Sequence, residues 1–329
     1  MKLWELSRYG LTSCVALALL AGCGGSQSST GFSDLPSSPP ATARASQVAA
    51  RDDTGGTLLY VGHGNQISVL TYPGGKMVGQ LTGFKGLEGL CSDPQGNVFA
   101  VDGTAETISE YAHGGTSPIA VLNDTGNAPN GCAIDPTTGN LAVAGGGGHI
   151  QTNVAVYPSA SGSPTVYVDY TAFEPYYYCT YDNAGNIFMA SQSTGPGYLI
   201  ELPSASISFK YYSLSRTFTA TRHSVAWDGS DFAVGNPPGY QKGSMKIYRV
   251  QLTSSGASVV RTITLKDKKG QTAAIGSQLW IDGSTVIYPE ASQSKAGFWR
   301  YPLGNMDTKT VRVGDGDIYG IAVSSSETP

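Results

Sequence analysis

The sequence predicts an all-β protein, a six-bladed β-propeller in which N-terminal and C-terminal strands complete one blade together. Two observations predict this fold: a strand–turn–strand repeat with a period in the forties, and a surplus strand near the C-terminus. A period of that length, built from strands alone, is typical of propeller blades. The chain of 329 residues is long enough for one such domain.

Composition favours the same fold class. The chain has 43 Gly and 19 Tyr residues but only 13% charged residues, which suits short strands and tight turns better than long amphipathic helices. The formal net charge of −4 comes without a basic block. A nucleic-acid partner is therefore not expected.

Residues 1–22 have the pattern of a secretory signal peptide, with a basic start and a short apolar run, Leu11–Ala21. That run is well below the ~20 residues needed to span a bilayer. The segment Leu20-Ala21-Gly22-Cys23 resembles the lipobox of bacterial lipoproteins. The resemblance implies that Cys23 carries a lipid anchor; the alternative is an ordinary cleaved signal with a chance Cys at its end.

Residues 23–56 are rich in Ser, Gly, Ala, Thr and Pro, and such a segment buries too little apolar surface to order itself. We expect a disordered tether here and the propeller over residues 57–326. No Asp follows Cys23, which in similar Gram-negative lipoproteins favours the outer membrane. The expectation is an exported, lipid-anchored monomer of the cell envelope.

The repeat is clearest in three segments, Gly89–Val101, Gly131–Val143 and Tyr178–Met189. Each consists of an apolar strand, a turn of the Asp-Pro-x-Gly-Asn type, and a second apolar strand. The aspartates that mark the turns are Asp93, Asp135, Asp182, Asp228 and Asp282. The second strand of the unit occurs six times, at Leu58–Val61, Val98–Val101, Leu141–Val143, Ile187–Met189, Phe232–Val234 and Val286–Tyr288.

The first second-type strand, Leu58–Val61, has no strand before it, and Gly320–Val323 is left over after the last unit. We expect these two strands to pair, which closes the ring and leaves no open sheet edge. The segments Gly89–Asp102 and Pro129–Pro136 resemble NHL-type propellers and the gluconolactonase group. The resemblance spans residues 57–324 and implies a six-bladed fold, but it says little about chemistry.

The expected binding face lies where the innermost strands begin and the second strands end, because loops converge there on a concave site. Its candidate residues are Glu88, Asn130, Tyr177, His223 and Tyr319 at the strand starts, and Asp102, Asn236 and Glu290 at the strand ends. The adjacent tyrosines of Tyr176–Tyr178 suit either ligand stacking at the channel mouth or core packing between blades.

Gluconolactonase relatives hold a divalent metal at this hub, so the resemblance implies Glu88 and Asn130 as ligands of Ca²⁺ or Zn²⁺. Tyr177 and His223 stand where further ligands are needed, and a hard cation takes six to eight oxygens. The alternative is that Glu88 and Asn130 are polar residues at a water-filled channel. His223, next to Arg222, suits a general base, an anion contact or a hydrogen-bonded structural residue.

Cys91, Cys132 and Cys179 all fall on innermost strands, but alternation turns Cys91 to the opposite face from the other two. The pattern predicts three buried thiols, with a single disulfide as the alternative. No catalytic residue is predicted. We therefore expect a non-catalytic binding or scaffold domain, without a cofactor, for a partner protein, glycan or envelope component. The alternative is a metal-dependent hydrolase of lactones or esters.

Overall fold

The computed structural model describes residues 56–172, 174–192, 196–218, 222–237, 245–267, 278–290 and 294–326. The predicted signal peptide and almost all of the predicted tether, including Cys23, lie outside these residues. Within the described ranges no helix is both long enough and apolar enough to cross a membrane.

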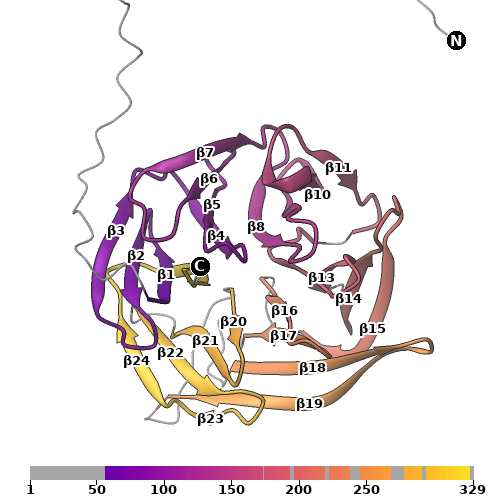
Figure 1. The fold of residues 1–329 in the computed structure, drawn as a ribbon. Coiled ribbons are helices and arrows are strands. Elements are labelled where there is room, and N and C mark those ends of the chain that lie inside the picture. Colours follow the sequence, from indigo (N-terminus) through magenta and orange to yellow (C-terminus); the bar gives the residue numbers. More distant parts are fainter. Residues whose placement is uncertain are drawn as a thin grey trace, which may run out of the picture. The chain divides into compact units, whose positions relative to one another are not determined.

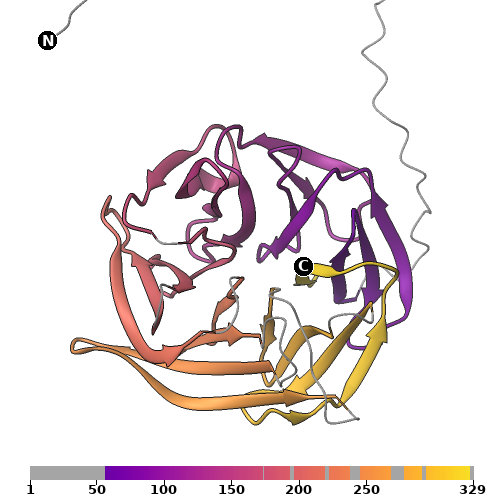
Figure 2. The same cartoon turned by 180° about the vertical axis from the view of Figure 1, so that it is seen from behind.

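Six sheets surround a central channel, which confirms the predicted propeller (Figure 1 and, from behind, Figure 2). Their described strands pair antiparallel except at one short parallel pair, β19 with β23. From the channel outwards, the first blade contains β25 (Ile318–Ser324), β1 (Leu58–His63), β2 (Gln66–Thr71) and β3 (Met77–Thr82). The second contains β4 (Leu87–Ser92), β5 (Val98–Asp102), β6 (Thr107–Tyr111) and β7 (Pro118–Asn123). The third contains β8 (Pro129–Ile134), β9 (Leu141–Gly147), β10 (Ile150–Tyr157) and β11 (Thr165–Val168), with a short 3-10 helix, η1 (Pro158–Ala160), after β10.

The fourth blade contains β12 (Cys179–Tyr181), β13 (Ile187–Gln192), β14 (Pro196–Leu202) and β15 (Lys210–Thr217). The fifth contains β16 (Val225–Trp227), β17 (Phe232–Asn236), β18 (Met245–Thr253), β19 (Gly256–Lys266) and the short β23 (Asn305–Met306). The sixth contains β20 (Trp280–Asp282), β21 (Thr285–Glu290), β22 (Lys295–Arg300) and β24 (Lys309–Arg312).

The ring closes as predicted. Strand β25 pairs antiparallel with β1, so that Ala322 lies opposite Tyr60 and Ile321 opposite Val61. The predicted strands are all present, but the sequence did not predict β23. This segment of the sixth blade pairs in parallel with β19 at Leu265 and Asn305, and so extends the fifth blade.

The marking aspartates form the turns that the repeat predicts. The carboxylate of Asp93 accepts the Asn97 backbone N–H at 2.7 Å and its side-chain amide at 2.8 Å. Gly96, between them, has a φ of 87°, a conformation that suits glycine. Asp182 and Asn186 repeat these two hydrogen bonds at 2.9 and 2.8 Å. The Asp, Gly and Asn of the repeat therefore fix the hairpin between the first and second strands.

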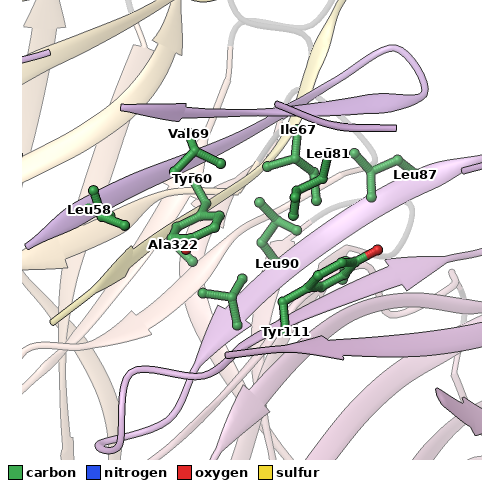
Figure 3. Close-up of a cluster of buried hydrophobic side chains, with 11 residues drawn as sticks. Leu58, Tyr60, Ile67, Val69, Leu81, Leu87, Leu90, Tyr111 and Ala322 are labelled. Atoms are coloured by element: carbon green, nitrogen blue, oxygen red, sulfur yellow. The ribbon is translucent and has the colours of Figure 1, made fainter. Parts of the chain in front are cut away.

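The hydrophobic core lies between neighbouring sheets. In Figure 3, Tyr60 and Ala322 of the first blade pack with Leu90 and Tyr111 of the second. Every residue of β1 is buried, because a sheet inside the ring contacts another blade on each side. This two-sided burial explains why the second strands are continuous apolar runs rather than alternating ones.

The same packing corrects one prediction. Cys91 of β4 and Cys132 of β8 form a disulfide, with Cα atoms 5.6 Å apart, while Cys179 is a buried free thiol. The prediction of three buried thiols was therefore wrong, and the single-disulfide alternative holds. Neighbouring blades pack face to face. A side chain on one face of β4 and a side chain on the opposite face of β8 therefore point towards each other.

Candidate functional site

The central channel has two ends, which the direction of the innermost strands distinguishes. We call the end at which these strands begin the strand-start face, and the end at which the Asp turns follow them the strand-end face. The predicted hub residues belong to the strand-start face.

An ion pair crosses the channel at the strand-start face. Arg222 Nη1 lies 2.6 Å from Glu88 Oε2, and the two side chains are 29% and 24% exposed. The Arg222 guanidinium also lies 4.6 Å from the ring centre of Tyr177 and 5.8 Å from that of Tyr319, close enough for cation–π attraction. Side chains from four different blades therefore meet at this end.

The surroundings of Arg222 keep its side chain positively charged. Burial acts to lower the pKa of Arg222, but the Glu88 carboxylate more than offsets this effect and raises the pKa above its ordinary value. The guanidinium stays cationic, and Glu88 is its counter-ion. Of the predicted hub residues, Glu88, Tyr177 and Tyr319 are thus brought together by a residue that the predicted set omitted.

Gln278 crosses between blades deeper in the channel. Its side-chain oxygen accepts the backbone N–H groups of Leu90, at 3.0 Å, and Ile321, at 3.3 Å, and its amide nitrogen donates to Leu90 O at 2.5 Å. Its own backbone N–H donates to Tyr319 O at 3.3 Å. This buried side chain joins the sixth blade to the first and second.

Two other predicted hub residues have structural partners. Asn130 is buried and donates from Nδ2 to the carbonyl oxygens of Gly146 and Tyr176, at 3.3 and 3.1 Å. The buried carboxylate of Asp102 accepts three backbone N–H groups, from Lys85, Gly86 and Ala105, at 2.7 to 2.9 Å. Asp102 therefore fixes loop geometry.

The remaining three hub residues also make internal contacts. The His223 ring is fully buried, 4.2 Å from the ring centre of Phe218 and with Nδ1 3.3 Å from Gly235 O. Asn236 is buried and donates to the Tyr248 hydroxyl at 3.3 Å. Glu290 accepts from Thr310 Oγ1 at 3.1 Å, and burial raises the pKa of Glu290. These environments are those of packed structural residues.

The tyrosines of Tyr176–Tyr178 divide between the two interpretations. Tyr176 is buried and donates to Asp169 Oδ2, and Tyr178 is buried and donates to Tyr319 O at 3.0 Å. Both belong to the core. Tyr177 lies between them in sequence and turns to Arg222 instead.

Glu88 and Asn130 do not fit the metal site that the resemblance implies. The carboxylate of Glu88 is paired with Arg222, and the Asn130 amide donates to two carbonyl groups. Arg222 also places a positive charge where a cation would bind. In the part of the chain that the structure describes, no group of three or more His, Cys, Asp or Glu side chains could hold a metal ion.

A pocket of about 330 Å³ occupies the channel towards the strand-end face. Trp227 and Trp280, from the innermost strands of the fifth and sixth blades, contribute to its lining together with Tyr181, Pro94 and Pro136. The Cys91–Cys132 disulfide and the Cys179 thiol also line it. Burial raises the pKa of Cys179 to about 12, so this thiol stays protonated at neutral pH and is a poor nucleophile.

Three polar side chains of this pocket have partners within the protein, whereas the buried hydroxyl of Tyr181 has none among the described residues. Ser92 Oγ donates to Val323 O at 2.8 Å, and Asp93 holds Asn97 through two hydrogen bonds. Thr180 Oγ1 accepts the backbone N–H of Trp227 at 3.2 Å. The pocket therefore offers mainly apolar and aromatic surface. The sequence prediction placed the binding site at the opposite face, although the two Trp-containing innermost strands were visible in the repeat.

Comparison with protein-family models finds no match, and comparison with curated proteins finds no relative. Solved structures are similar over most of the chain. A chain of a nidogen/laminin complex has a TM-score of 0.64 and 13% identity, covering 82% of this chain and 99% of its own length. A protein of unknown function from Bacteroides caccae has a TM-score of 0.61 and 16% identity, with 82% and 99% covered. TolB from Acinetobacter baumannii has a TM-score of 0.57 and 12% identity, with 84% and 69% covered. The likeness is one of fold.

Proposed function

We propose that this chain is a lipid-anchored, non-catalytic binding protein of the cell envelope, and that its strand-end pocket receives an apolar or aromatic side chain of a partner protein. The anchor follows from the lipobox-like segment that ends at Cys23. The binding role follows from the pocket, whose lining offers contact surface rather than reactive groups.

The proposed binding role rests on the contrast between the two ends of the channel. Side chains of four blades meet around Arg222 at one end, whereas the other end holds a pocket lined by Trp227 and Trp280. At about 330 Å³ the pocket is at the small end of the range for ligand sites, ~300–1,000 Å³. A partner's aromatic or aliphatic side chain fits such a site as an anchor residue.

A protein partner is favoured over a glycan by the state of the polar groups. A sugar needs hydrogen-bond partners for several hydroxyls, but Ser92, Asp93 and Thr180 already bond within the protein. The solved nidogen/laminin complex supports the proposal in that a propeller of this fold takes part there in a protein assembly. The hydrolase alternative is not favoured, because Glu88 and Asn130 are engaged with other residues.

The test uses N-acetyl-tryptophan amide, N-acetyl-phenylalanine amide and maltose as probes, with saturation-transfer NMR as the measurement. We expect transfer to the two aromatic amides and none to maltose. Ala226→Leu narrows the pocket without removing a large side chain, and should weaken binding of the amides about tenfold. Tyr177→Ala, at the strand-start face, is the matched control and should leave that binding unchanged.

Circular dichroism and the melting temperature of each variant establish that it is folded. The proposal is wrong if the aromatic amides show no transfer, or if Tyr177→Ala abolishes it while Ala226→Leu does not. Transfer to maltose that is sensitive to Ala226→Leu would replace the protein partner with a glycan.

A further inference from the structure

Exposed apolar side chains recur at one corner of the blades. Of the ten large apolar side chains that are exposed in the described residues, five occupy equivalent places, one in each of five blades: Met77 is 45% exposed, Ile119 58%, Val166 38%, Ile207 83% and Leu303 66%. Met306, 39% exposed, lies in the same connection as Leu303. The five belong to the first, second, third, fourth and sixth blades. Each lies in the connection that follows the third strand of its blade, or within the first two residues of the fourth strand.

This corner is at the strand-end face. The second strand of a blade runs antiparallel to the first and the third antiparallel to the second, so the third strand ends where the innermost strand ends. The five side chains therefore surround the face that holds the pocket. They are spread over five blades rather than gathered into one patch.

The chain also enters the propeller at this face. Strand β1 is a second strand, so it begins at the strand-end face, two residues after Gly56. His113 Nε2 forms a hydrogen bond of 3.0 Å with Gly56 O, and His113 Nδ1 forms one of 2.7 Å with Ser324 Oγ. Ser324 Oγ in turn donates to Gly96 O, in the turn that begins at the pocket residue Asp93. Gly56, the first described residue, therefore lies near the rim of the pocket.

We propose that the strand-end face docks on the surface of the lipid bilayer, with the exposed apolar side chains inserted among the lipid head groups. This inference rests on the lipid anchor of the proposed function. Docking turns the pocket towards the bilayer, so a partner that fills the pocket either lies in the membrane or binds while the propeller is undocked. The tether predicted between Cys23 and Gly56 spans 33 residues, which for a random coil corresponds to a reach of about 30 Å. Such a tether keeps the propeller near the membrane but does not determine which face contacts the bilayer. The exposed apolar side chains determine that orientation.

The arrangement of the side chains favours lipid over a second copy of the chain. A protein interface needs a contiguous, complementary apolar patch, whereas fluid lipid can surround single side chains that are separated around a ring. The turns of this face carry Asp93, Asp135 and Asp182. Lys76, Arg300 and Lys309 lie in or next to the connections after the third strands of the first and sixth blades, so both signs of charge are present. Docking should therefore not depend on anionic lipid.

The first test measures sedimentation with phosphatidylcholine vesicles. It uses a chain that begins at Gly24, which keeps every strand of the closed ring. We expect Ile207→Ser with Leu303→Ser to lower the bound fraction about tenfold, because both side chains are strongly exposed and lose their contact with lipid. The matched control is Tyr170→Ser with Ile150→Ser, an exposed pair at the strand-start end of the third blade, which should leave binding unchanged.

Equal losses in the two double variants, or no vesicle binding by the chain that begins at Gly24, would overturn the inference. The second test reconstitutes the full lipidated chain and labels Ile207→Cys or Tyr170→Cys with an environment-sensitive fluorophore. Nitroxide lipids should quench the label at 207 at least threefold more than the label at 170. Equal quenching contradicts docking by this face.

These results are distinguishable from failure of the proposed function. A mass spectrum without lipid on Cys23 removes the anchor and leaves the sedimentation test in force. Loss of aromatic-amide binding in Ala226→Leu concerns the pocket alone.

Discussion

Gln278 offers a sharp test of how the channel is held together. Its buried amide makes three hydrogen bonds to the backbone of Leu90 and Ile321. Gln278→Leu keeps the size of the side chain but removes all three. Each such bond contributes about 1 kcal/mol net, and a buried backbone group left without a partner costs about 1–3 kcal/mol. We expect the variant to lose about 3 kcal/mol of unfolding free energy, since water in the adjacent pocket can replace part of the bonding.

The assay is equilibrium unfolding in urea, compared at a constant m-value. The matched control is Gln80→Leu. Gln80 donates to Gln66 Oε1 at 2.6 Å in a half-buried pair on the outer strands of the first blade, so its loss should cost less than about 1 kcal/mol. If Gln278→Leu costs no more than Gln80→Leu, the amide does not join the blades, and the reasoning fails.

Three further predictions concern charge, the disulfide and metal. Burial acts to raise the pKa of Asp228, but hydrogen bonds from Arg249 and other groups hold it well below its ordinary value. Ionised Asp228 therefore stabilises the fold above about pH 4. This contribution is lost as the pH falls further. Urea unfolding of Asp228→Asn should thus depend less on pH between about 4 and 2 than that of the unaltered chain, and equal slopes would contradict this assignment. Replacing both Cys91 and Cys132 by Ala should cost about 4 kcal/mol, the chain-entropy estimate for a separation of 41 residues; a loss below about 1 kcal/mol would show that the disulfide matters little. Glu88→Gln should cost under about 1 kcal/mol because the ion pair is partly exposed, and chelator should leave the melting temperature unchanged; stoichiometric Ca²⁺ or Zn²⁺ lost in that variant would restore the metal hypothesis.

The fold was predictable because the repeat encodes it locally. In the turns of Asp93 and Asp182, the Asp and Asn side chains bond to one another and the Gly between them takes a positive φ, so five residues are enough to mark these hairpins. Closure by β25 followed from counting strands. Strand β23 was not predictable, because its two residues pair with a different blade and carry no apolar alternation.

The site was less predictable, because it depends on which blades face one another. Arg222 is next to His223 in sequence, yet Arg222 crosses the channel to Glu88 while His223 is buried against Phe218. One sequence gives no distance across the channel, so the two neighbours could not be told apart. The disulfide was missed for a related reason: alternation was applied to each strand separately, whereas Cys91 and Cys132 meet between two sheets.

Strand β25 follows all the other described strands along the chain, yet it completes the first blade. A chain that lacks residues 318–324 leaves one backbone edge of β1 without a neighbour and uncovers Tyr60 and Val61, which are fully buried in the complete protein. Exposed strand edges and apolar side chains invite aggregation and proteolysis. A chain that stops before residue 318 should therefore aggregate or be cleaved more readily than one that contains β25.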